Sequence, residues 1–251
     1  PTTTLFGMHD DGLFDERAAA VYDEAGADMF APEVLGPTVA TLAELADGRP
    51  ALELAIGTGR VALPLRATGV DVTGIELSRA MVAKLREKPG GDEVPITIGD
   101  MATTVVGEGF GLVYLVYNTI SNLLSQDEQV ACFCNAAAHL APGGHFVIEM
   151  FVPNLRRLPP GETFVPFDVS DRHVGVDEYD VVDQRVTSHH YSIDDGRVDV
   201  FRTPHRYAWH AEYDLMARIA GLELQERWAD WTRARFTAES ASHVSVWRKP
   251  G

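Results

Sequence analysis

The stretch LELAIGTGR, residues 52–60, combines a carboxylate with two glycines at the end of an apolar run. Together with Ala62, Gly57 and Gly59 satisfy the pattern Gly-x-Gly-x-x-Gly/Ala of loops that bind dinucleotides. Glu53, however, stands just ahead of this loop, and an unneutralised carboxylate in a cleft would penalise a pyrophosphate. The same carboxylate would attract an amine or a sulfonium, while the glycines still allow close approach to the backbone. The stretch therefore indicates a ligand with a cationic tail.

Two further acids end the next two predicted strands. Glu76 closes DVTGIEL, and a carboxylate at this place can accept both hydroxyls of a ribose. Asp100, in IGDM, can accept a hydrogen bond from the exocyclic amine of adenine, with Met101 against the ring face. Any one of these acids, taken alone, could equally be a solvated loop residue without a binding role. Taken together and in order, they match the parts of an adenosine that carries a cationic tail.

The elements that must position these residues alternate between strand and helix. Buried strand patterns are followed by helical periodicity, and Ser78 and Ser125 stand where helix N-caps are expected. Such alternation predicts an α/β fold with an open parallel sheet whose ligand crevice lies at the carboxyl ends of the strands. The predicted strands are ALELAI, DVTGIEL, VPITIGD, FGLVYLVYN and HFVIEMF.

Beyond Phe151 the alternation stops, and the pattern predicts a small antiparallel β insertion before the last helix. VDEYDVVDQRVTSHHYSI and RVDVFRTPHRYAWH read as the arms of a long hairpin that turns at Asp195-Gly196. We expect a single domain, 1–251, in four parts. These are an N-terminal helical lid region (1–46), a cofactor-binding core (47–152), a β-hairpin insertion over the active site (153–209), and the last helix with two closing strands (210–251).

Composition excludes several partners. The 37 acidic residues outnumber the 21 basic ones, and a net charge of −16 repels a phosphate backbone, so we expect no nucleic acid partner. No apolar run approaches membrane-spanning length, and PTTTLFGMHDDG lacks the pattern of a signal peptide, so we expect no membrane partner and a cytoplasmic location. Cys132 and Cys134 are expected to be buried thiols, with no metal site.

Four motifs resemble those of the class I S-adenosylmethionine-dependent methyltransferases: LELAIGTGR, DVTGIELS, IGDM and LAPGGHFVIEMF. AGLELQERW and HVSVWR resemble the last two strands of that family, so the likeness extends over residues 22–248, with 156–206 as the variable part. It is strongest to the bacterial small-molecule branch, which includes amino-sugar N-methyltransferases and glycine N-methyltransferase. The resemblance implies a Rossmann-like open seven-stranded sheet, mostly parallel with an antiparallel last strand. It also implies S-adenosyl-L-methionine as cofactor, S-adenosyl-L-homocysteine as product, and a small-molecule acceptor methylated on nitrogen or oxygen, such as a natural-product or sugar intermediate.

The resemblance also implies which residues bind the cofactor. Ala55, Gly57 and Gly59 would line its methionine part, with Glu53 near the ammonium; Ala55 departs from the usual glycine. Tyr117 and Asn118 would lie near the transferable methyl. The full implied set, in chain order, is Tyr22, Glu53, Ala55, Gly57, Gly59, Glu76, Leu77, Met81, Asp100, Met101, Tyr117 and Asn118.

A catalytic base cannot be chosen from the sequence. An amine acceptor needs only to be unprotonated, whereas a hydroxyl usually needs a base. His189, His190 and Tyr117 are the candidates, and because His189 and His190 are consecutive on a strand, only one of these two can face inward. The other residues of suitable chemistry are His205, His210 and Glu149.

Two other functions share part of this pattern. A nicotinamide-dependent oxidoreductase would use the same glycine turn and Glu76, but would not need Glu53 or Asp100. A non-catalytic S-adenosylmethionine-binding protein would keep all three acids. The sequence allows either a monomer or a homodimer.

Overall fold

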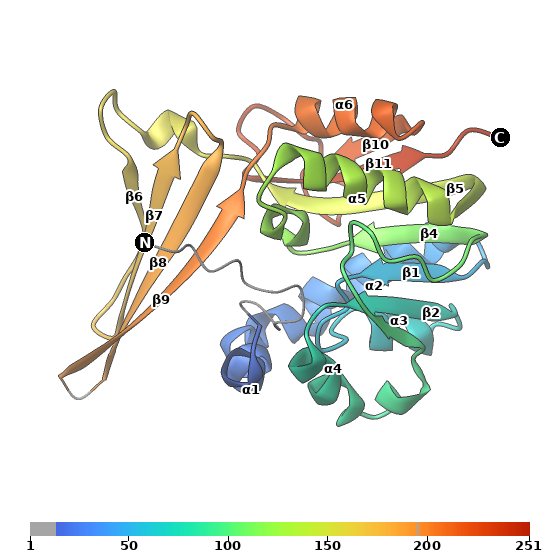
Figure 1. Ribbon diagram of the computed structural model, residues 1–251, viewed down its shortest axis with the longest axis horizontal. Coiled ribbons are helices and arrows are strands. Elements are labelled where there is room, and N and C mark those ends of the chain that lie inside the picture. Colours follow the sequence, from blue (N-terminus) through green and yellow to red (C-terminus); the bar gives the residue numbers. More distant parts are fainter. Residues whose placement is uncertain (1–13, 195) are drawn as a thin grey trace, which may run out of the picture.

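The computed structural model describes residues 14–194 and 196–251, which form two β-sheets with helices around the larger one (Figure 1). The first thirteen residues of the expected lid region and Asp195 of the expected turn lie outside the described residues. The larger sheet has seven strands in the order β10-β11-β5-β4-β1-β2-β3. Their bounds are β1 Ala51–Leu54, β2 Val72–Glu76, β3 Ile96–Ile98, β4 Phe110–Leu115, β5 Leu140–Phe151, β10 Glu223–Trp228 and β11 Ser242–Arg248.

Strand direction in this sheet agrees with the sequence prediction. β3, β2, β1, β4 and β5 pair in parallel, whereas β11 runs antiparallel to both of its neighbours, β5 and β10. β1 and β4 are buried along their whole length. Continuous apolar runs such as FGLVYL are typical of strands covered on both faces. The expected Rossmann-like fold is confirmed, and it brings the carboxyl ends of β1, β2 and β4 to one edge.

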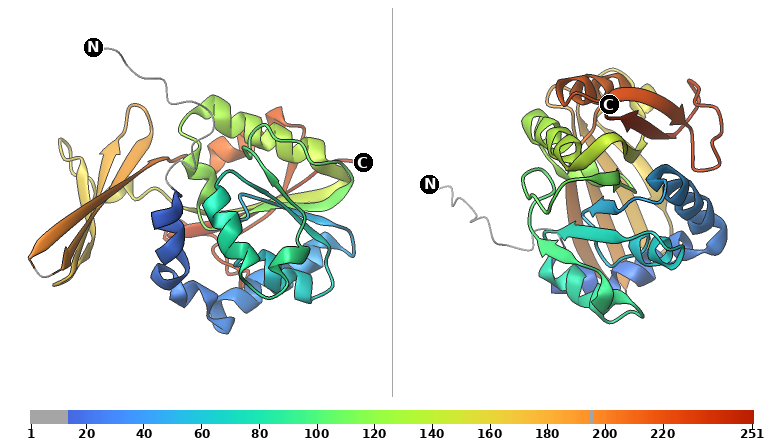
Figure 2. Two further views of the ribbon diagram at one scale, coloured as in Figure 1. Left: turned by 60° about the horizontal axis from the view of Figure 1, so that its bottom comes forward. Right: turned by 90° about the vertical axis from the view of Figure 1, so that its right-hand side faces the viewer.

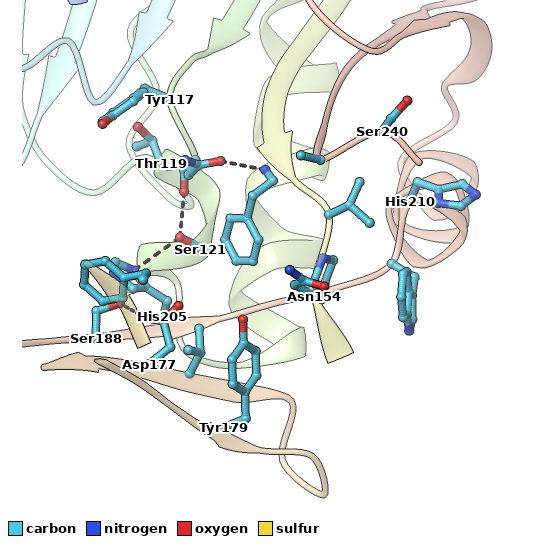
Figure 3. A pocket seen from close by; sticks show the side chains of 18 of the residues that line it. Tyr117, Thr119, Ser121, Asn154, Asp177, Tyr179, Ser188, His205, His210 and Ser240 are labelled. Carbon is cyan, nitrogen blue, oxygen red and sulfur yellow. Dashed lines mark hydrogen bonds between the residues drawn. The ribbon is translucent and has the colours of Figure 1, made fainter. Parts of the chain in front are cut away.

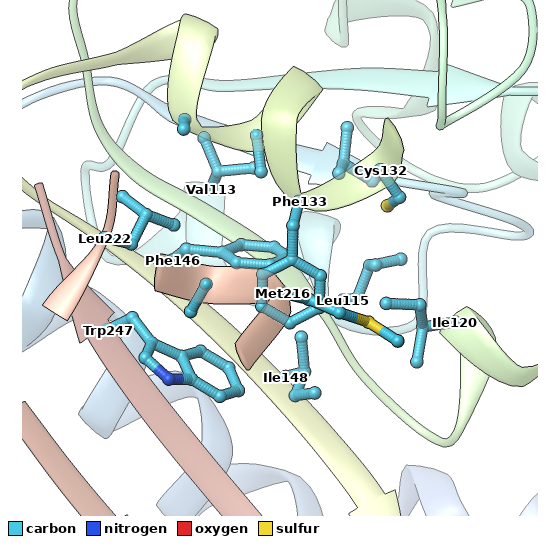
Figure 4. Close-up of a cluster of buried hydrophobic side chains, with 14 of the residues drawn as sticks. Val113, Leu115, Ile120, Cys132, Phe133, Phe146, Ile148, Met216, Leu222 and Trp247 are labelled. Carbon is cyan, nitrogen blue, oxygen red and sulfur yellow. The ribbon is translucent and has the colours of Figure 1, made fainter. Parts of the chain in front are cut away.

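Helices cover both faces of this sheet (Figure 2). One face packs on α2 (Pro32–Ala46), α3 (Ala62–Ala67) and α4 (Arg79–Arg86), and the other on α5 (Gln126–His139) and α6 (His210–Ile219). Under α5, Phe133 meets Phe146 and Trp247 edge-on, with ring centroids 5.0 and 5.2 Å apart (Figure 4). Among the described residues, no helix has the length and apolarity needed to cross a membrane.

Capping residues fix where two of the helices begin. The Ser78 hydroxyl accepts a hydrogen bond from the Met81 amide at 3.1 Å at the start of α4. Ser125 and Glu128 form a complete capping box at the start of α5. The cap at Ser78 matters for the site, because it holds α4 directly after the strand end at Glu76.

The insertion is larger than the expected hairpin. It is a four-stranded antiparallel sheet, β6-β7-β8-β9, that lies beside the main sheet (Figure 1). The segment read as one long arm turns back on itself, because the Asp180 carboxylate accepts from the amides of Val182 and Asp183. Such side-chain caps of a turn are a common use of aspartate. The strands are β6 Phe164–Val169, β7 His173–Asp180, β8 Arg185–Asp194 and β9 Arg197–Arg206.

The two cysteines behave differently from each other. Cys132 is buried in α5, as expected, but Cys134 is exposed, so the expectation of two buried thiols is wrong for Cys134. Residues two apart on a helix point to different faces, and α5 buries only one of these faces.

Candidate functional site

The glycine turn after β1 is tied to the end of β2 by one carboxylate. Glu76 is 6% exposed; its Oε2 accepts from the Gly57 amide at 2.7 Å, and its Oε1 accepts from the Ser78 amide at 2.9 Å. Hydrogen bonds to an ionised acceptor are roughly twice as strong as neutral ones. Glu76 therefore fixes the two loops against each other before any ligand arrives.

The turn needs backbone conformations that glycine adopts most easily. Ala55, Gly57 and Gly59 have φ of 56°, 58° and 79°. A side chain at Gly59 would also come within 2.9 Å of Leu85 in α4, so this glycine is required for packing as well. Ala55 adopts the left-handed conformation without being glycine, which costs a residue with a Cβ about 1–2 kcal/mol.

The residues expected around an adenine lie at the ends of β2 and β3. Leu77 is 48% exposed, a high value for a leucine beside a buried strand. Asp100 caps its own turn, with Oδ1 accepting from the Ala102 amide at 2.6 Å, and Met101 packs partly against the core. Met81 is buried beneath the glycine turn, with its Cε atom 3.5 Å from where a Cβ on Gly57 would lie.

Glu53 lies deeper than the other acids of the site. It is 3% exposed, and its Oε2 accepts from the Tyr114 hydroxyl at 3.0 Å. Burial raises the pKa of Glu53 to about 8, although the hydrogen bond from Tyr114 and the nearby charge of Arg60 favour the ionised form. At neutral pH this carboxyl therefore holds a proton for much of the time, and an approaching cation would displace that proton.

Two consecutive residues after β4 share an unusual backbone conformation. Tyr117 and Asn118 have φ of 56° and 62°. Glu149 on β5 holds both, because its carboxylate accepts from the Tyr117 amide at 2.9 Å and its carbonyl from the Asn118 amide at 3.0 Å. The Asn118 side chain in turn accepts from the Phe151 amide at 2.7 Å. Glu149 thus stabilises this turn, and the turn directs the Tyr117 side chain outward.

Tyr22, on α1 (Glu16–Ala25), connects the strand ends with a large cavity. Its pKa is raised chiefly by burial, with Arg60, Tyr117 and Glu76 close enough to contribute. The Arg60 guanidinium lies 5.5 Å from the centre of the Tyr117 ring. Tyr22, Tyr117 and Asn118 all line the cavity, whereas the glycines of the turn and the acids Glu53, Glu76 and Asp100 do not.

The cavity has a volume of about 1290 Å³ and lies between the main sheet and the four-stranded insertion. Figure 3 shows Tyr117, Thr119 and Ser121 on one side, with Asp177, Tyr179 and Ser188 of the insertion on the other. This volume exceeds the 300–1,000 Å³ that is usual for small-molecule pockets. The insertion therefore supplies one wall of a separate chamber beside the strand ends.

The structure separates the two adjacent histidines of β8. His190 lines the cavity, whereas His189 lies on the opposite face of the sheet, with its Nε2 2.9 Å from a Glu178 carboxylate oxygen and its Nδ1 accepting from Arg202. The alternation of a strand explains the difference. His205 and His210 also line the cavity.

Sequence reasoning missed the polar floor of this chamber. Asp177 and Ser188 are directly opposite on β7 and β8, and the Ser188 hydroxyl donates to Asp177 Oδ1 at 2.6 Å. Burial raises the pKa of Asp177, partly offset by Ser188 and by nearby His190. Because side chains alternate along a strand, the sequence could have placed Ser188 and His190 on one face. It did not predict that Asp177 pairs with Ser188, because the turn at Asp180 lies inside a segment that reads as one continuous strand.

Comparisons with known proteins agree with this geometry. A family model described as a methyltransferase domain matches residues 51–144. The solved structure of the CcbJ methyltransferase from Streptomyces caelestis is 40% identical, with a TM-score of 0.85 over 96% of this chain and 100% of that one. The cypemycin N-terminal methyltransferase of a Streptomyces species is 28% identical over 95% of this chain and 98% of its own length. A dTDP-4-amino-2,3,4,6-tetradeoxy-D-glucose N,N-dimethyltransferase of Saccharopolyspora spinosa is 38% identical over 42% of this chain and 41% of its own.

Replacing Glu53 with Gln is expected to change how stability depends on pH. The folded pKa of about 8 lies above the unfolded value of 4.5, so between these values the folded protein binds a proton that the unfolded chain has lost. The free energy of unfolding must then fall as pH rises through this window. Glu53→Gln should abolish that fall, measured by urea unfolding at several pH values. Glu93→Gln, at an exposed carboxylate, is the control and should keep the wild-type slope. A wild-type slope in Glu53→Gln would contradict the assignment.

Proposed function

The chain belongs to the class I S-adenosylmethionine-dependent methyltransferases, and we propose that it methylates an amine of a small molecule held in the cavity. One observation carries the proposal: Tyr22 lines the chamber together with Tyr117 and also lies close enough to Glu76, at the end of β2, for that carboxylate to affect its pKa. A cofactor at the strand ends would thus point its reactive end toward an acceptor in the chamber.

In this proposal S-adenosylmethionine spans the carboxyl edge of the sheet. Glu76 takes the ribose hydroxyls, since each oxygen of a carboxylate can accept more than one hydrogen bond. Asp100 takes the adenine amine, and the exposed side chain of Leu77 covers the ring. The methionine part lies along Ala55, Gly57 and Gly59, with its ammonium near Glu53. The methyl group reaches the chamber beside Tyr117 and Asn118.

Methyl transfer from a sulfonium is an in-line displacement, and positive charge is dispersed as the methyl moves. Catalysis then consists mainly in holding nucleophile, carbon and sulfur in line and excluding water, which is worth several kcal/mol. The paired left-handed residues Tyr117 and Asn118, fixed by Glu149 and Phe151, form a rigid rim for that alignment.

The chemistry of the chamber favours an amine over a hydroxyl as the acceptor. Asp177 places a carboxylate on the floor, and among the described residues no Lys or Arg forms an ion pair with it. The other carboxylate of the lining, Glu239, lies 3.5 Å from Arg156. An unneutralised carboxylate in an aromatic-rich cavity attracts an ammonium ion. The cypemycin and amino-sugar relatives are named for methylation of nitrogen. A monomer or homodimer, a cytoplasmic location and the absence of nucleic acid or membrane partners stay predictions.

Isothermal calorimetry separates this function from nicotinamide-dependent chemistry. S-adenosylmethionine should bind, and NAD and NADP should not. Because the ammonium would ionise Glu53, binding at pH 7 should release protons, seen as a heat that changes with the ionisation enthalpy of the buffer. Glu53→Gln should bind without that release. Uptake of NAD and none of S-adenosylmethionine would overturn the proposal.

Removing either adenosine-binding acid should weaken cofactor binding. Glu76→Ala and Asp100→Ala are each expected to cost roughly 1–3 kcal/mol, the range for leaving a polar ligand group unsatisfied. Glu76→Gln is the matched variant for the first, since it keeps one oxygen acceptor for the turn. Circular dichroism checks that each variant remains folded. Unchanged affinity in both alanine variants would remove the adenosine assignment.

Asp177→Asn tests the nature of the acceptor. In a turnover screen that pairs benzylamine with benzyl alcohol and glucosamine with glucose, only the amines should be methylated. For such an amine, Asp177→Asn should raise KM about tenfold or more, as expected for loss of a charge-assisted contact, with little change in cofactor affinity. Asp171→Asn, on an exposed loop, should behave as wild type. Turnover of the alcohols alone would contradict an amine acceptor.

A further inference from the structure

A hydrogen-bond chain connects the rim of the chamber to one histidine of the insertion. The Ser121 hydroxyl lies in the short helix η3 (Thr119–Asn122) and donates to the carbonyl of Asn118 at 2.6 Å. The Nδ1 atom of His205, on β9, lies 3.3 Å from the same hydroxyl (Figure 3). His205 is thereby attached to the turn at which the cofactor methyl is expected.

These two hydrogen bonds determine which ring nitrogen of His205 carries the proton. A serine hydroxyl has one proton, and Ser121 gives it to the Asn118 carbonyl, so its oxygen must accept from His205. His205 Nδ1 therefore carries a hydrogen, and a neutral ring then has its lone pair on Nε2. Among the described residues, none hydrogen-bonds to this Nε2, and the ring lines the cavity.

His205 is better placed than the other histidine of this sheet face. His190 pairs with Phe201, four residues from His205 along β9. At about 3.3 Å per residue, four residues of β9 span about 13 Å along the strand between the pair partner of His190 and His205. It is held in a second network, since its Nδ1 is 3.1 Å from Nε2 of His173, whose Nδ1 is 2.5 Å from Asp168. Of these two histidines, His205 is thus the one that contacts the turn at the rim.

The surroundings of His205 keep it neutral. Burial lowers its pKa below 6.5, and His190 on β8 lowers it further. The other titratable groups that share this part of the chamber are Asp177 and Tyr179 on β7 and Tyr117 after β4. At neutral pH the ring is therefore ready to accept a proton on Nε2.

We propose that His205 is the proton acceptor of the methyl transfer, with Ser121 as the positioning residue that fixes its tautomer. The inference rests on the proposed function, because the proton comes from the acceptor amine. The ammonium form of the acceptor gives one proton to Nε2 of His205, which leaves a lone pair on the acceptor nitrogen. That lone pair forms the new bond to the methyl carbon, the carbon–sulfur bond breaks, and its electron pair stays on the sulfur of S-adenosylhomocysteine. The imidazolium then returns the proton to water.

Nitrogen NMR of histidine-labelled protein tests the tautomer without any acceptor. At neutral pH, with or without S-adenosylhomocysteine, His205 should be neutral with hydrogen on Nδ1, and its signal is assigned by its loss in His205→Asn. Ser121→Ala should mix the two tautomers, and Ser121→Thr should restore the first. A hydrogen on Nε2, or a ring that stays protonated above pH 7, would overturn the inference.

Steady-state kinetics tests the role, with an amine that turns over in the acceptor screen. Wild-type kcat should fall as pH drops through the pKa of His205, below 6.5. His205→Asn should lose this limb and lower kcat by about a hundredfold or more, the usual contribution of a general base, with KM changed little. Ser121→Ala should shift the pH at which kcat falls, and Ser121→Thr should restore the wild-type profile. His189→Asn, on the opposite face, is the matched control and should keep the wild-type profile.

The outcomes separate the two claims. Failure to bind S-adenosylmethionine would overturn the proposed function and would leave the tautomer of His205 unaffected. Normal binding and turnover with an unchanged pH profile in His205→Asn would overturn the inference alone.

Discussion

The geometry of the site depends on the carboxylate of Glu76. Its two oxygens take the amides of Gly57 and Ser78, so one side chain joins the turn after β1 to the cap of α4. Without it these two amides would be left without acceptors in a buried place, at a cost of about 1–3 kcal/mol for each. A carboxylate oxygen can accept more than one hydrogen bond, so a ribose hydroxyl can bind to the same side chain. The group that is expected to bind the cofactor is thus the group that builds the loop around it.

Glu53 shows how burial changes a charge argument made from sequence. A carboxylate ahead of a glycine turn suggests a standing negative charge, but this one is buried and its pKa is about 8. A nearby phosphate would raise this pKa further and keep Glu53 protonated, so repulsion by a fixed charge is weaker than the sequence suggests. The preference for a cation survives, because a cation is the ligand that makes this ionisation favourable. Arg60 and Tyr114 reduce the free-energy cost of ionising Glu53 without removing it.

The main sheet was predictable because its signals are local: apolar runs, glycine turns, the caps at Ser78 and Ser125, and acids at strand ends. The insertion was only partly predictable, since the turn at Asp180 depends on a side-chain cap inside a continuous β-rich segment. The chamber could not be derived, because Ser121 and His205 are 84 residues apart and meet only when the insertion folds back. Alternation did predict that one of His189 and His190 faces inward, but not which. The cofactor-binding assignments stay predictions.

A crystal structure with S-adenosylhomocysteine tests the central claim most directly. The account predicts both ribose hydroxyls within hydrogen-bond distance of Glu76, about 2.6–2.8 Å. It also predicts the adenine amine on Asp100 and the sulfur facing the chamber between Tyr22 and Tyr117. A nucleoside bound elsewhere, or a sulfur that faces away from the chamber, would contradict it.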